Sequence, residues 1–136
     1  MTASYLLPIL QSYLRLRHAL DIDLGKLRYL VLQPTRELAA KRHNMLQSLS
    51  KYLPSSFNSA ALFGGSSLKD ERRKITYECP DLVIATPGRL IDHMQNTKGF
   101  SMEDIEVLVL DEADRLLEMG FKDEFMQVLK SCISSK

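Results

Sequence analysis

The sequence feature that most constrains the fold is a short apolar run that ends in a cluster of acids. Residues 105–110 are mostly β-branched residues and leucine, and Asp111, Glu112 and Asp114 follow at once. Such a run is typical of a strand buried on both faces of a parallel sheet. Carboxylates are costly to desolvate, so their place at the carboxyl end of a buried strand favours a role in holding a cation or a water.

Two interpretations of these acids are open at this point. In the first, residues 111–114 merely open the next helix, since acidic residues in a first turn accept from free amides and suit the helix dipole. In the second, Asp111 positions Mg²⁺ on nucleotide phosphates, and Glu112 orients or deprotonates the attacking water. The rest of the chain has to decide between them.

Composition limits the classes of protein to consider. The chain has 136 residues, 45% of them hydrophobic, which suffices for one core and predicts one domain or part of one. The 18 basic and 17 acidic residues give a net charge of +1. This balance argues against a polybasic tail that binds nucleic acid by bulk charge, so any contact with a polyanion must be local.

Cysteine, histidine and hydropathy patterns add weaker constraints. Cys79 and Cys132 lie far apart with no metal-ligand spacing, which predicts two reduced, packed thiols in a cytosolic or nuclear compartment. The three histidines show no metal spacing either, and we expect them to be surface or packing residues. Neither a signal peptide nor an apolar run long enough for a membrane span is evident, so we expect a soluble intracellular protein without membrane contact.

Apolar runs and helical patterns alternate along the chain. Besides residues 105–110, strands are predicted over residues 27–32, 59–63 and 82–85. Helices are predicted over residues 1–14 with Pro8 near the start or at a kink, from Thr35 to about residue 49, over residues 66–75, from near Arg89, over 115–119, and after Gly120. Residues 15–26 are expected to be a polar connector, and the charges of 66–75 a solvated face. The alternation predicts an α/β fold with a parallel sheet and helices on both faces.

Two of the predicted strands end in the same way. Proline and threonine stand at each carboxyl tip, and an arginine, Arg36 or Arg89, stands at the start of the following helix. Two such tips on one sheet edge would give a basic, amide-rich rim suited to successive phosphates of a single nucleic-acid strand. Taken alone, Arg36 could equally pair with Glu37 or be solvated, and Gly64-Gly65 could be an ordinary tight turn.

Four motifs taken together resemble the series found in the DEAD-box ATP-dependent RNA helicases, in family order and with similar spacing. They are Pro34-Thr35-Arg36-Glu37-Leu38-Ala39, Gly64-Gly65, Thr86-Pro87-Gly88-Arg89 and Asp111-Glu112-Ala113-Asp114. The resemblance covers nearly the whole chain. It implies that residues 1–136 are a partial helicase ATP-binding domain, the first RecA-like domain, which binds ATP and Mg²⁺.

The resemblance also implies a role for each motif. Asp111 would act on Mg²⁺ through coordinated water, Glu112 would serve the hydrolytic water, and Asp114 would link the nucleotide site to other motifs. The backbone of one RNA strand, or of a short duplex, would be held without sequence specificity by Pro34, Thr35, Arg36, Gly64, Gly65, Thr86, Pro87, Gly88 and Arg89. Unwinding would require a second RecA-like domain as partner.

The chain departs from the family pattern at its two ends. If Thr2 matches the last, nucleotide-binding residue of the family's P-loop, Met1 stands where a phosphate-binding lysine is expected. The P-loop strand, the strand after the acidic motif and the second domain are not in the sequence, so we expect an incomplete sheet with open edges, marginal stability or association. We also expect weak ATP binding and no RNA-stimulated hydrolysis by this chain alone. Lys41 replaces a common glutamine, a minor change.

Three functional hypotheses follow. The chain is a fragment of an ATP-dependent RNA helicase, or a truncated, non-catalytic module that binds RNA or a partner, or more remotely part of a DNA helicase or another P-loop NTPase. The flank of residues 101–107 and the segment 116–121 resemble nucleolar ribosome-assembly members. This resemblance implies a role in ribosome biogenesis and favours the nucleus or nucleolus, with the cytoplasm as the alternative.

Overall fold

The computed structural model describes residues 4–19, 26–64 and 67–134. Four strands alternate with six helices in this part of the chain. The strands are β1 (Tyr29–Leu32), β2 (Ser59–Leu62), β3 (Leu82–Ala85) and β4 (Val107–Leu110). The helices are α1 (Leu6–Ala19), α2 (Arg36–Ser50), α3 (Leu68–Glu78), α4 (Pro87–Asn96), α5 (Ala113–Glu118) and α6 (Lys122–Ile133).

The strands form one parallel sheet in the order β2-β3-β1-β4. Their register is even: Ala85 at the end of β3 pairs with both Leu62 and Leu32, and Leu32 pairs with Leu110. All four strands therefore end at the same level. The predicted α/β class and parallel sheet are confirmed.

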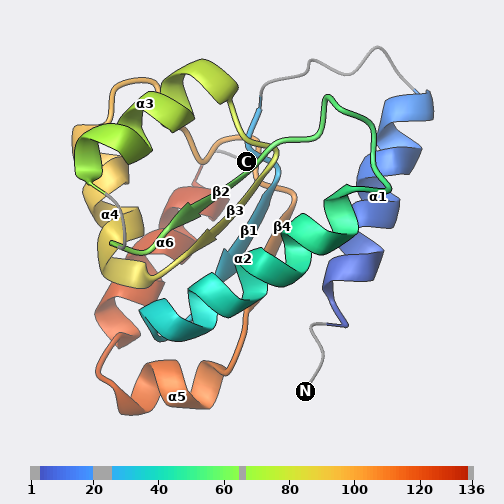
Figure 1. Cartoon of the computed structure of the whole chain (residues 1–136). Helices are drawn as coiled ribbons and strands as arrows, with labels where there is room; N and C mark the ends of the chain where they lie inside the picture. The colour runs from blue at the N-terminus through green and yellow to red at the C-terminus, as the bar shows by residue number, and fades with distance from the viewer. Residues whose placement is uncertain (1–3, 20–25, 65–66, 135–136) are drawn as a thin grey trace.

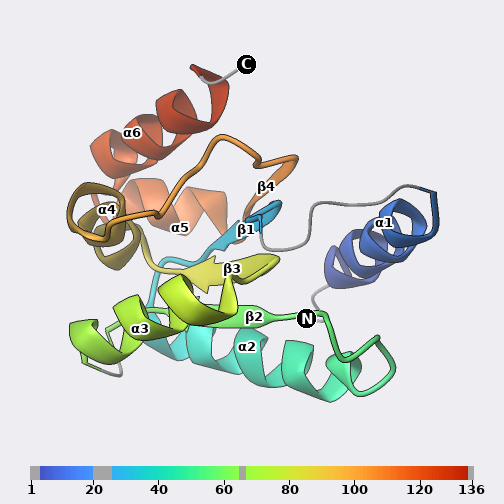
Figure 2. The same cartoon turned by 90° about the horizontal axis from the view of Figure 1, so that it is seen from above.

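Helices cover both faces of the sheet, as Figures 1 and 2 show. Helices α3, α4 and α6 pack on one face, around buried residues such as Ile75, Leu90 and Val128. Helices α1 and α2 pack on the other face, where Tyr13 and Leu46 are buried against Tyr29 and its neighbours. This division into two cores is what parallel strands with helical crossovers require.

Local sequence signals set the starts of the helices. Thr35 and Ser67 cap α2 and α3, because their hydroxyl oxygens accept from the backbone amides of Leu38 and Asp70. Helix α4 begins at Pro87, whose fixed φ suits the first turn and whose missing amide proton leaves no donor unpaired. Both helices that follow a Thr-Pro or Pro-Thr tip thus begin at the strand end.

Three sequence predictions are wrong in part. Residues 15–19, expected to be connector, continue α1. Because this helix begins at Leu6, Pro8 lies in its first turn, where proline is tolerated. Strand β4 is half-buried rather than buried on both faces, because it pairs with β1 alone among the described strands. Cys79 is exposed at the end of α3 rather than packed, whereas Cys132 is buried.

None of the described helices is long and apolar enough to cross a membrane.

Candidate functional site

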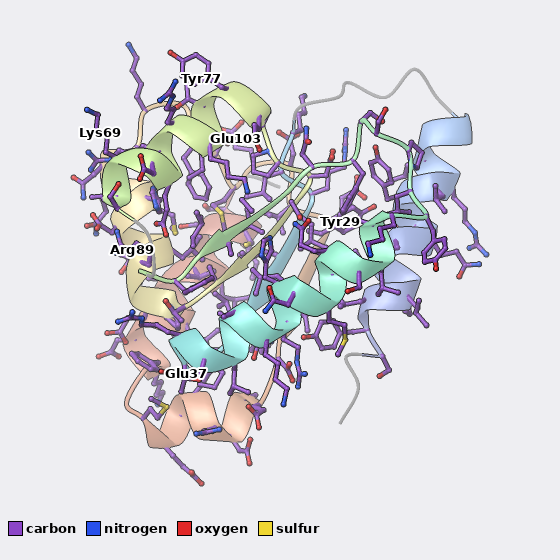
Figure 3. The ribbon with its side chains drawn as sticks, in the orientation of Figure 1. Tyr29, Glu37, Lys69, Tyr77, Arg89 and Glu103 are labelled. Atoms are coloured by element: carbon purple, nitrogen blue, oxygen red, sulfur yellow. The ribbon has the colours of Figure 1, made fainter. Side chains whose placement is uncertain are left out.

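The sheet register brings the predicted motifs to one edge. Because β1, β2, β3 and β4 are parallel and end level, the segments that follow them start side by side. Neighbouring strands lie about 4.8 Å apart, so the first and last of four tips are separated by roughly 14 Å. In Figure 3, Arg89 and Glu37 lie towards this edge, while Tyr77 and Glu103 lie towards the other end of the strands.

The tip of β1 presents an uncompensated arginine. Pro34 is buried and stops the strand, Thr35 caps α2, and Arg36 is exposed as the first residue of that helix. Within residues 4–19, 26–64 and 67–134, Arg36 takes part in no ion pair with Glu37 or another acid, so the solvated form of Arg36 is the one observed. Its charge opposes the helix dipole, a conflict that a bound phosphate would relieve.

The tips of β2 and β3 meet through Gly64 and Arg89. Gly64 has φ +81°, and a Cβ added there would lie 3.1 Å from Nη2 of Arg89. The guanidinium therefore lies directly against the glycine backbone. Thr86 makes no capping hydrogen bond with its side chain, and Gly88 is exposed beside it. The structure thus joins two motifs that are 25 positions apart, while Gly65 lies outside the described residues.

At the tip of β4, three side chains converge on one carboxylate oxygen. Oδ2 of Asp111 accepts from Nε2 of Gln33 at 2.7 Å, from the hydroxyl of Tyr5 at 2.8 Å and from Nε of Arg42 at 3.1 Å. These donors come from the start of α1, the end of β1 and the middle of α2. The side chains of Arg42 and Asp111 are 9% and 16% exposed, so their ion pair is largely shielded from water.

This arrangement shifts the pKa of each ionisable partner. Burial alone would raise the pKa of Asp111, but the hydrogen bonds from Gln33, Tyr5 and Arg42 and the charge of Arg42 outweigh it and hold that pKa below its usual value. Burial, and then the bond to Asp111, raise the pKa of Tyr5. Burial would lower the pKa of Arg42, yet Asp111 raises it above the ordinary value. Asp111 is therefore an anion and Tyr5 a neutral donor.

The other two acids of the motif face solvent. Glu112 has the left-handed φ of 52°, uncommon for a residue with a side chain, and Asp114 is exposed in the first turn of α5. Oε2 of Glu112 lies 3.8 Å from Nη1 of Arg115, an exposed and weak pair. Strained backbone of this kind clusters at functional sites, where the strain fixes the direction of a side chain.

The donor set fits a magnesium ion held through water. Magnesium usually keeps several waters and needs one or two carboxylates plus substrate phosphates. The described hydrogen bonds of Asp111 all use Oδ2, which leaves Oδ1 to accept from a metal-bound water. Oε1 of Gln33 is buried without a hydrogen-bond partner in the described residues and belongs to the same amide that contacts Asp111, so it can accept from a water too. Thr2, the predicted nucleotide contact, lies outside the described residues.

Sequence reasoning missed Tyr5, Gln33 and Arg42 around Asp111, and Glu71 beside Arg89. A usable signal existed for two of them. Arg42 follows Leu38 by four positions and precedes Leu46 by four, and Glu71 follows Leu68 by three positions and precedes Ile75 by four. A charged residue inside an apolar helical stripe predicts a buried, paired group. Glu71 is buried, so the prediction that residues 66–75 present a fully solvated charged face is wrong at that position.

Comparison with known proteins adds independent information. The model of the DEAD/DEAH box helicase family matches residues 2–136. A probable ATP-dependent RNA helicase, ddx27, of Dictyostelium discoideum is 43% identical over 135 residues, which is 99% of this chain and 16% of that protein. The ATP-dependent RNA helicase DRS1 of Lodderomyces elongisporus is 42% identical over 128 residues, 94% of this chain and 18% of that protein. The chain thus spans less than a fifth of these relatives.

Solved structures agree with this result. The DEAD-box helicase Mss116 bound to ssRNA and UDP-BeF superposes with a TM-score of 0.86 at 28% identity, covering 97% of this chain and 26% of that one. A hypothetical ATP-dependent RNA helicase from Sulfolobus tokodaii gives a TM-score of 0.75 at 31% identity, covering 98% and 35%. The motifs, the level strand tips and the family match lead to one conclusion: this chain belongs to the DEAD/DEAH box helicase family.

Proposed function

We propose that residues 1–136 form part of the first RecA-like domain of an ATP-dependent RNA helicase. In this proposal the chain binds the backbone of an RNA strand and Mg-ATP, and a second RecA-like domain completes both binding sites. The family membership and the RNA-bound structural neighbour support the proposal. The observation that carries it is the register that levels Leu62, Ala85, Leu32 and Leu110, since that register puts both sets of motifs on one edge.

On the RNA side, the chain offers a few directed donors rather than a basic surface. Arg36 and Arg89 stand at the starts of α2 and α4, where free backbone amides also point outward. At Gly88 the position of a Cβ has no atom within 4 Å, so a sugar-phosphate backbone can approach the chain closely there, whereas the space beside Gly64 is taken by the guanidinium of Arg89. Thr35, Thr86, Pro34 and Pro87 shape the two tips. Contacts of this kind read phosphates and not bases, which accounts for a binder with a net charge of +1.

On the nucleotide side, Asp111 and Glu112 divide the work. Magnesium, when bound, neutralises charge on the phosphate oxygens of ATP. Asp111 would hold a water of that ion through Oδ1, while its Oδ2 is fixed by Gln33, Tyr5 and Arg42. Glu112, exposed and set by its left-handed backbone, orients the attacking water and receives its proton. Asp114 faces solvent two residues further on, in the first turn of α5, and would link the nucleotide site to other motifs.

The cellular role is a separate proposal. Curated relatives include proteins named DRS1 and ddx27, and two flanks of the chain resemble nucleolar ribosome-assembly helicases. We therefore place the parent protein in the nucleolus, acting on ribosomal RNA precursors. Co-localisation of the tagged parent protein with a nucleolar marker is the expected result, and an exclusively cytoplasmic signal would contradict it.

A binding experiment tests the RNA grip. Fluorescence anisotropy of a labelled ten-nucleotide oligouridylate should report weaker binding by Arg36→Ala and Arg89→Ala, each by on the order of tenfold, the value of about one charge-assisted phosphate contact. Lys51→Ala and Lys98→Ala are matched controls, because these exposed lysines lie at the far ends of α2 and α4. Equal losses for all four variants would mean that only bulk charge matters, and the proposal would fail.

A second candidate is a non-catalytic module that binds RNA or a partner. One observation favours it for this chain by itself: a cation of the protein, Arg42, already occupies Oδ2 of the carboxylate that would serve the metal. RNA binding without any hydrolysis would fit this candidate. Competition between oligouridylate and the matching DNA strand separates both candidates from a DNA helicase, since RNA preference depends on contacts to the 2′-hydroxyl.

A further inference from the structure

Helix α3 carries a buried carboxylate, that of Glu71, which takes no part in the proposed nucleotide site. Glu71 lies on the apolar face of the helix, and its side chain is 3% exposed. An ionised carboxylate buried without partners is strongly unfavourable, so this group has to be held by donors. A hydrogen-bond partner, His93, and an ion-pair partner, Arg89, both come from α4, the helix that begins at the Thr-Pro tip.

The first partner is a histidine that is itself fixed. Nε2 of His93 lies 2.8 Å from Oε1 of Glu71, and Nδ1 lies 2.7 Å from Oγ1 of Thr97. The His93 ring is fully buried and held at both nitrogens. The hydrogen bond with this fixed ring therefore holds the Glu71 carboxylate in one position and restricts its side-chain rotamers.

The second partner is Arg89, which lies four residues before His93 and forms an ion pair with Glu71. Its Nε lies 3.6 Å from the same Oε1, and its Nη2 lies against the backbone of Gly64. The side chain is 22% exposed, so part of the guanidinium still reaches the surface. A planar guanidinium with one side held by a carboxylate and one edge against a glycine has its remaining donors aimed in one direction.

We propose that Glu71 is a positioning residue for RNA binding: it aims Arg89 at a backbone phosphate and itself touches no RNA. This inference rests on the function proposed above, in which Arg89 contacts RNA. A free arginine loses much rotamer freedom when it binds, and an arginine already held by a buried carboxylate has lost that freedom on folding. Thr97 holds His93, His93 holds Glu71, and Glu71 pairs with Arg89, so these contacts in series restrict the orientation of the guanidinium.

Charge alone predicts the opposite sign, which makes the inference testable. Removing a carboxylate near a phosphate site should strengthen RNA binding if only the electrostatic field matters. If Glu71 positions Arg89, Glu71→Gln weakens binding of the labelled oligouridylate by the 136-residue chain about three- to tenfold. Glu71→Asp keeps the charge but withdraws the carboxylate by one methylene, and it should weaken binding as well. Glu78→Gln, an exposed change on the same helix, is the control and should bind like the wild type.

A double-mutant cycle completes the test. Glu71→Gln should cost nothing further once Arg89→Ala is present, because there is then nothing to position. A purely structural role would instead give additive losses that follow the melting temperature, measured by circular dichroism. Wild-type affinity in both Glu71 variants, with Arg89→Ala still weakened, would overturn the positioning role and leave the proposed function intact. Unchanged binding by Arg89→Ala would overturn the proposed function, and the inference with it.

Discussion

Replacing Arg42 with methionine tests the polar cluster around Asp111. Methionine keeps an unbranched apolar stem but is shorter than arginine and removes the cation, leaving a largely buried carboxylate with Tyr5 and Gln33 as donors. Two unit charges 4 Å apart attract by about 4 kcal/mol at an effective dielectric constant of 20. Removing one partner of a buried pair typically costs about 3–5 kcal/mol. Because two donors remain, we expect a loss of about 2–3 kcal/mol in the free energy of unfolding.

Urea denaturation followed by circular dichroism gives the measurement. With a urea dependence of about 1.5 kcal/mol per molar, a loss of 2–3 kcal/mol lowers the midpoint by roughly 1.3–2 M. Sucrose in all samples keeps the variants folded at zero urea. Lys41→Met, one residue earlier on α2 and exposed, is the matched control and should change the stability by less than about 0.5 kcal/mol.

Combining Arg42→Met with Asp111→Asn shows whether the loss of stability comes from the ion pair between Arg42 and Asp111. Asparagine removes the charge that Arg42 compensates, so Arg42→Met should cost at least about 1 kcal/mol less in that background. Additive effects within about 0.5 kcal/mol would refute the coupling. So would an Arg42→Met midpoint equal to that of Lys41→Met, because either result would mean that the carboxylate does not depend on this cation.

Four further predictions follow from the same contacts. The pKa of Asp111 is lower in the folded state than its ordinary value of 3.8, so its contribution to stability is present above about pH 4 and is lost as the pH falls through the folded pKa. Urea midpoints measured from pH 6 to pH 3 should therefore fall more for the wild type than for Asp111→Asn. Parallel curves for the two proteins would contradict this. Gly64→Ala should cost about 1–2 kcal/mol and weaken RNA binding, because φ +81° disfavours a side chain and the new Cβ would press on Arg89; wild-type values in both assays would be inconsistent with the close approach. Thr35→Ala should lower stability by about 1 kcal/mol through the lost cap of α2, whereas Thr35→Ser should not, and equal stabilities would argue against the cap. The 136-residue chain should release no phosphate from ATP in an RNA-dependent way. Hydrolysis requires loop amides and a lysine that hold the phosphates, and these 136 residues do not include them. RNA-stimulated turnover would refute this prediction.

The fold was largely predictable because its signals are local. Each predicted strand is confirmed to within two residues, since short apolar runs leave few alternatives when a proline or glycine follows two positions later, as it does after three of the four strands. Parallel pairing followed from the alternation with helices. The error at residues 15–19 has a physical reason: a polar segment with good helix formers extends a helix when its neighbouring turns are already packed.

The site was predictable in position but not in its supporting contacts. Motif residues follow strand ends, and parallel strands bring such ends together, so the shared edge could be inferred without coordinates. The pairing of Arg42 with Asp111 joins residues 69 positions apart, and that of Glu71 with Arg89 depends on how α3 and α4 pack. Sequence spacing within one helix shows that such a residue is buried, but it does not show which group on another element it meets.

Chemical-shift mapping of RNA on the ¹⁵N-labelled chain tests the central claim most directly. Titration with the ten-nucleotide oligouridylate should shift the amide signals of Arg36, Gly64, Gly88 and Arg89, which lie at the carboxyl edge of the sheet. Signals near the opposite edge, such as those of Lys26 and Ser101, should stay in place. Shifts gathered at that opposite edge, or no shifts at all at saturating RNA, would contradict the account.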